Sequence, residues 1–186
     1  MGIPTLIKTL TASDSASLAF VDGASDVTLD STYDEYMFVF TDINPETSGA
    51  EFTFQVNATD DAGGGYDTSL ITSTWFNSQM QENDSNAQLG YQGGLDLAQS
   101  ASGQNLMYSM GTESDESGAG IMHLFSPAST TYVKHFYART HVYTQNDQSH
   151  DNFIAGYIND TTAIDDIQFK MDSGNFNGKI KMWGVK

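Results

Sequence analysis

Short apolar blocks with a period of two constrain this chain more than any other feature of its sequence. Residues 52–56, Phe-Thr-Phe-Gln-Val, alternate apolar and polar side chains, as a strand does when one face meets a core and the other meets water. Gly, Asn, Asp and Ser bound most of the blocks, and such residues are typical of turns between strands. The pattern predicts an all-β fold.

The arrangement of the blocks predicts two hairpins and a sandwich. Residues 36–40 are apolar on both pleat faces and should form a central strand, which the turn around Pro45 joins to residues 52–56. The strands Ile164–Met171 and Gly178–Val185 flank turn residues and predict a hairpin that ends the chain on a paired strand. The other candidate strands are 5–10, 17–21, 69–76, 106–110, 120–125, 131–143 and 152–157. About ten strands predict a jelly-roll-like antiparallel β-sandwich in one domain over residues 1–186.

Residues 77–119 are rich in loop-forming residues and span more chain than a compact domain usually leaves irregular. Their Ser, Gly, Asn and Gln side chains are interspersed with tyrosine and leucine, which suits adaptable contacts. A short helix around residues 94–99 that packs the segment down is the alternative.

The charge of the chain excludes nucleic acid as a partner. The net charge is −17, and residues 1–133 hold 18 acidic residues against Lys8 alone, while residues 134–186 hold six of each sign. Phosphate binding needs clustered basic residues, which this chain does not offer. No stretch is long and apolar enough for a membrane span, and the absence of cysteine excludes disulfides and thiol chemistry.

A calcium site is one candidate binding site in the sequence. Asp60, Asp61 and Asp67 surround three consecutive glycines, which would let carboxylates and carbonyls converge on a hard cation. The spacing is not that of an EF-hand, and a solvated acidic turn is the alternative. No cofactor other than calcium is indicated.

Aromatic residues beside amide and acidic side chains are the second candidate, since many proteins hold sugars in this way. Trp75, Tyr91 and Tyr108 are the residues that we expect in such a glycan site. The alternative is that most of the aromatic residues fill the core. No motif of a hydrolase, nucleotide-binding protein or metalloprotease is present, so we do not expect an enzyme, and no catalytic residue is nominated.

Three segments carry a resemblance: Leu29–Phe40, His123–Thr131 and Ser173–Lys186. In them the chain resembles virion proteins of tailed bacteriophages found among marine phages, including those of cyanobacteria and ocean heterotrophs. The resemblance implies a virion structural protein, either a head decoration protein or a module of a tail fibre or other appendage. Its partners would be other virion proteins and copies of itself, and it would assemble in the cytoplasm of the host bacterium. The alternative is a carbohydrate-binding module of a tail fibre that recognises a host surface glycan.

Overall fold

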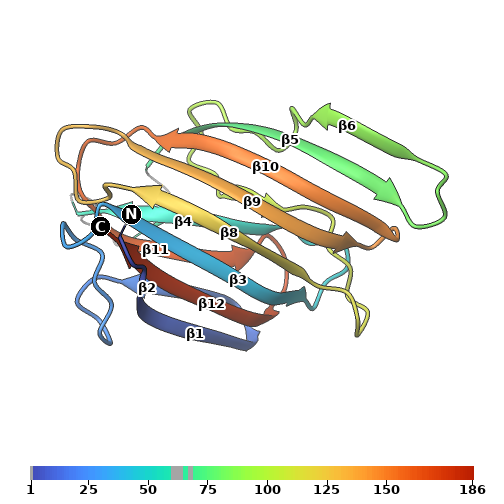
Figure 1. The fold of residues 1–186 in the computed structure, drawn as a ribbon, viewed down its shortest axis with the longest axis horizontal. Coiled ribbons are helices and arrows are strands. Elements are labelled where there is room, and N and C mark those ends of the chain that lie inside the picture. The colour runs from blue at the N-terminus through green and yellow to red at the C-terminus, as the bar shows by residue number, and fades with distance from the viewer. Residues whose placement is uncertain (1, 60–64, 67–68) are drawn as a thin grey trace.

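The computed structural model describes residues 2–59, 65–66 and 69–186. In these ranges the chain forms two antiparallel β-sheets and no helix, so no helix could span a membrane. Figure 1 shows the larger sheet as a broad layer over the smaller one.

Twelve strands lie in the described ranges. In spatial order, the eight-stranded sheet consists of β1 (Thr5–Ser15), β12 (Phe176–Val185), β3 (Glu35–Pro45), β8 (Gly118–Phe125), β9 (Lys134–Thr144), β10 (Gln148–Ile158), β5 (Ile71–Gln81) and β6 (Ala87–Tyr91). The four-stranded sheet consists of β2 (Ser17–Val21), β11 (Ile164–Met171), β4 (Phe52–Ala58) and β7 (Gln104–Met107).

The connectivity is that of a jelly roll with an added half-sheet. The first four strands of the larger sheet, in spatial order, are β1, β12, β3 and β8, and the smaller sheet has the order β2, β11, β4 and β7. Each strand of the first set is directly before or after the corresponding strand of the second set in the sequence. Two four-stranded antiparallel layers linked in this way make a jelly roll, which confirms the predicted fold class. Beyond β8 the larger sheet continues with β9, β10, β5 and β6. We call these four strands the extension.

Aromatic rings fill the core between the two layers. Phe169 of β11 lies with its ring centroid 5.3 Å from those of Phe38 and Phe40 in β3, and 6.0 Å from that of Phe52 in β4. All four side chains are buried. The predicted strand at residues 36–40 therefore does lie inside a sheet, with β12 on one side and β8 on the other.

Both predicted hairpins are wrong, although their strands exist. β3 and β4 lie in different sheets, and so do β11 and β12. β4 pairs with β11, and β3 pairs with β12. Alternation of apolar and polar residues determines which face of a strand is buried but not which strand is its neighbour. The expectation that the chain ends on a paired strand is confirmed, because β12 lies between β1 and β3.

The segment 77–119 is more ordered than its composition predicts. It contains β6, which the sequence pattern missed, and β7, and it includes the end of β5. After β6 the chain continues along the edge of β5, where the carbonyl of Leu97 accepts a hydrogen bond from the amide of Ser73 and Ser100 forms a bridge with Ile71. Residues 94–99 form turns and no helix.

Candidate ligand-binding surface

The structure separates the three aromatic residues predicted to form a glycan site. Trp75 points into the core and is fully buried, so the prediction is wrong for this residue. Tyr91 lies on the edge strand β6 with 59% of its surface exposed, and its hydroxyl donates to Asp96. Tyr108 follows β7 and stacks on the inward-facing His150 with 6.4 Å between ring centroids. Tyr91 and Tyr108 therefore do not share a site.

The predicted calcium ligands Asp60, Asp61 and Asp67 lie outside the described residues. Within the ranges that the structure does describe, no group of three or more histidine, aspartate or glutamate residues is arranged to hold a metal ion.

The outer surface of β8 and the extension carries two rows of residues that cross the strands and include several aromatic side chains. The first row runs from Ile121 through Arg139, Phe153 and Phe76 to Tyr91, each paired in register with the next. The second runs from His123 through Tyr137 and Ala155 to Thr74. Because alternate residues of a strand face the same side, all these side chains project away from the core. We call these nine residues, together with Asp151 on β10, the aromatic face.

The rings of the aromatic face are held in pairs. Phe76 and Phe153 stack almost parallel, with 4.9 Å between centroids and 2° between planes. Tyr137 stacks on His123 at 4.5 Å, and the His123 Nδ1 atom also contacts the Glu35 carboxylate. Tyr137 is 46% exposed and Phe76 is 43% exposed. These rings add little to the core and are available to a ligand.

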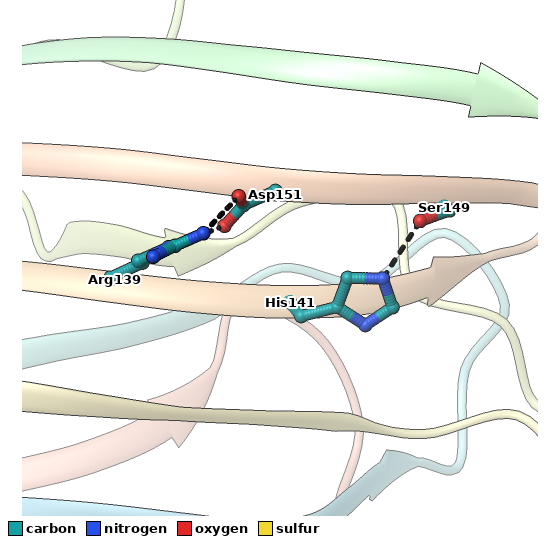
Figure 2. A network of polar contacts seen from close by, with 4 residues as sticks. All are labelled: Arg139, His141, Ser149 and Asp151. Carbon is teal, nitrogen blue, oxygen red and sulfur yellow. Dashed lines mark hydrogen bonds and ion pairs between the residues drawn. The ribbon is translucent and has the colours of Figure 1, made fainter.

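One ion pair joins Arg139 of the first row to Asp151, which lies on the side of that row away from the second row. Arg139 donates from Nε and Nη2 to the two carboxylate oxygens of Asp151, at 3.1 and 2.8 Å (Figure 2). The Arg139 guanidinium carbon lies 4.9 Å from the centroid of the Phe153 ring. The hydrogen bond to Asp151 raises the pKa of Arg139, so the arginine stays charged and its orientation is fixed by two contacts.

The aromatic face is almost free of the negative charge that dominates the chain. Asp151 is the one carboxylate among the outward-facing residues of β5, β8, β9 and β10, all of which the structure describes, and it is neutralised by Arg139. Two further carboxylates border the face, where Glu35 contacts His123 and Asp96 accepts a hydrogen bond from Tyr91. Depletion of charge with enrichment of aromatic residues and arginine is typical of binding surfaces.

Two shallow hollows meet at Arg139. One has a volume of about 390 Å³ and lies among Thr74, Phe76, Tyr137 and Phe153, with the small side chain of Ala155 in it. The other, of about 610 Å³, is bounded by Ile121, His141, Ser149 and Asp151, with Ala119 and Gly120 in it. The first is lined largely by apolar groups and the second by a mixture of polar and apolar groups. Ligand sites in proteins span about 300 to 1,000 Å³.

A contact between His141 and Ser149 deserves a chemical test, because a serine beside a histidine can act as a nucleophile. The Nε2 atom of His141 lies 2.8 Å from the Ser149 hydroxyl (Figure 2). In hydrolases a carboxylate orients the other ring nitrogen. Among the described residues no carboxylate contacts the other ring nitrogen of His141, and the neighbouring Asp151 is bound to Arg139, so these residues supply polar groups for binding but no complete triad.

The sequence held a signal for this surface that the predictions did not use. His135, Tyr137, Arg139 and His141 recur at every second residue of β9, so they must share a face. The pattern could not show that this face is open, because that depends on which elements cover the extension. No protein-family model, curated protein or solved structure matches this chain.

Proposed function

We propose that this chain is a non-catalytic structural protein of a tailed-bacteriophage virion, in a head decoration or an appendage, and that it acts by binding. The resemblance of residues 29–40, 123–131 and 173–186 to such virion proteins supplies the context. The jelly roll is compatible with it, since this fold is common in viral capsid proteins and lectins. A fold alone does not define a function, so the proposal depends on a site.

The observation that carries the proposal is the aromatic face. It projects Tyr137 and Phe76 from strands that lie outside the two four-stranded layers of the jelly roll. An exposed set of aromatic residues around one arginine has the composition of the residues that dominate binding energy in protein contacts. Because the face carries no net charge while the rest of the chain is strongly acidic, copies and partners can approach it without like-charge repulsion.

Particle association is the direct test. Mass spectrometry and sedimentation of purified virions of the phage that encodes the chain should find the protein in the particle. A high copy number would indicate capsid decoration, and a few copies would indicate an appendage. Absence of the protein from intact virions would contradict the proposal.

A matched pair of variants connects the particle to the face. Tyr137→Asp places a charge on the aromatic face, whereas Tyr108→Asp changes a tyrosine of similar exposure, 38% against 46%, on the other side of the larger sheet. If the face contacts other virion proteins, the first variant should be lost from particles and the second retained.

A further inference from the structure

The two hollows on the aromatic face differ in chemistry, and the difference points to the kind of ligand. Tyr137 and Phe76 present exposed ring surfaces at the smaller hollow, and Phe153 lies beside them between Phe76 and Arg139. Aromatic faces are weakly negative and therefore attract the polarised C–H groups on one side of a sugar ring. A flat apolar patch of a ligand is thus favoured at this hollow.

The larger hollow offers hydrogen-bonding groups of both kinds. Asp151 is an acceptor, Ser149 and His141 can donate or accept, and Arg139 uses two of its N–H groups on Asp151 and keeps others for a ligand. A hydroxyl group both donates and accepts, so a ligand with several adjacent hydroxyls can use all of these partners. Rigid pairing within the face fixes their positions before a ligand arrives, which lowers the entropic cost of binding.

The charge of the face restricts the ligand further. Its one arginine is paired with its one aspartate, and the two carboxylates at its border, Glu35 and Asp96, are bound to His123 and Tyr91. Neither an anion nor a cation therefore gains an unpaired counter-charge within the face. A polyanion would in addition meet a protein with a net charge of −17. A peptide that binds as an added strand needs a free strand edge, whereas both hollows lie over β9 and β10, which have neighbouring strands on both sides.

We propose that the aromatic face is a binding site for a neutral glycan. One pyranose ring lies in the smaller hollow against Tyr137 and Phe76, and the hydroxyls of the adjoining sugar contact Arg139, Asp151 and His141 in the larger one. This site differs from the one predicted from sequence, because Trp75 is buried and Tyr108 lies elsewhere. The inference extends the proposed function by naming the partner of the face, and it rests on that function only for its biological setting.

The test uses the full chain and a panel of neutral oligosaccharides with sulfated and sialylated counterparts, screened on an array and then titrated by calorimetry. The wild-type chain should bind at least one neutral glycan. Tyr137→Ala should weaken that binding by about tenfold, a typical effect of one aromatic contact, and Arg139→Gln should weaken it as well. Tyr108→Ala is the matched control and should bind as the wild type does. Thermal unfolding of each variant establishes that the fold is retained.

Three results would overturn the glycan site. They are no binding of any neutral glycan by the wild-type chain, preference for the charged glycans, or loss of binding in Tyr108→Ala with retention in Tyr137→Ala. These results are distinguishable from failure of the proposed function. If the chain binds no glycan but Tyr137→Asp removes it from virions, the face contacts protein, and the virion proposal stands without the glycan site.

Discussion

The hydroxyl of Tyr36 and the backbone of Asp30 form a reciprocal pair of hydrogen bonds. The Tyr36 hydroxyl accepts from the Asp30 amide at 3.0 Å and donates to the Asp30 carbonyl at 2.8 Å. Tyr36 is a fully buried residue of β3, and Asp30 belongs to the loop between β2 and β3. The pair ties that loop to β3.

Tyr36→Phe should therefore destabilise the protein by roughly 1–3 kcal/mol, because it leaves a poorly solvated amide and carbonyl without their partner. Chemical denaturation measures the change. Tyr132→Phe is the control, since Tyr132 is 73% exposed and loss of its hydroxyl should have almost no effect. Equal stability of the two variants would contradict the importance of the Asp30 pair.

Burial also makes Tyr36 a determinant of stability at high pH. Desolvation raises the pKa of Tyr36 to about 12, whereas a tyrosine in the unfolded chain titrates near about 10. Between these values the unfolded state loses a proton that the native state keeps, so stability should fall as pH rises from about 10 to about 12. Unfolding curves at several pH values test this. Tyr36→Phe should reduce the slope without removing it, because the pKa values of Tyr66 and Tyr143 are also raised to about 12.

His150 should make the stability of the protein depend on pH in the opposite sense, so that stability falls as the pH becomes mildly acidic. Burial lowers its pKa, and repulsion from His141 adds to the effect. Below about pH 6.5 the unfolded chain binds a proton at this residue that the native state does not, so stability is complete above that pH and decreases as pH falls below it. The unfolding midpoint at pH 5.5 and 7.5 should differ more in the wild type than in His150→Gln. A His135→Gln control, at an exposed position, should keep the wild-type difference.

Phe169 belongs to the core and Phe76 to the aromatic face, so removal of each ring should have a different effect on stability. Phe169 contacts five other phenylalanine rings in the core, and Phe169→Ala should cost about 3–5 kcal/mol. Phe76 is 43% exposed and stacks on Phe153 alone, so Phe76→Ala should cost much less. Denaturant midpoints give both values. A large loss in Phe76→Ala would mean that the face is part of the folding core.

The strands could be predicted from sequence because their burial follows a local rule. In β9 the buried residues recur at every second position, and in β11 they do so from Ile167 to Met171, and this period is visible in the sequence. The partners of β3 and β11 could not be predicted, since pairing depends on contacts between distant segments such as Phe40 with Phe169. β6 was missed because only one of its five residues, Leu89, is a strongly apolar aliphatic residue, and that one is 73% exposed.

For the candidate site too, the residue types could be read from the sequence, but their positions in the fold could not. Trp75 was expected at a ligand because it is a large aromatic residue near polar ones, but β5 carries aromatic and polar residues on both of its faces, with Trp75 buried and Phe76 exposed. The alternation of residues in β5 therefore does not show which of its two faces is buried. The position of the face became clear only from the topology, which places β9, β10 and β5 beyond the jelly roll.

Gly156 is the residue on which the spacing of these strands depends. A methyl group at this position of β10 would lie 2.5 Å from the Thr72 carbonyl oxygen and 2.8 Å from the Phe136 ring. Since the carbonyl belongs to the neighbouring strand and cannot rotate away, Gly156→Ala should force β10 and β5 apart and cost about 1–3 kcal/mol. The control is Gly90→Ala in β6, where no atom lies within 4 Å of the added carbon and the change in stability should stay within about 0.5 kcal/mol.

Because Phe153 and Asp151 lie on the same strand as Gly156, ligand binding at the aromatic face should weaken in Gly156→Ala and persist in Gly90→Ala. Unchanged stability in Gly156→Ala would mean that β10 can shift freely, and the face would then not be a preformed surface.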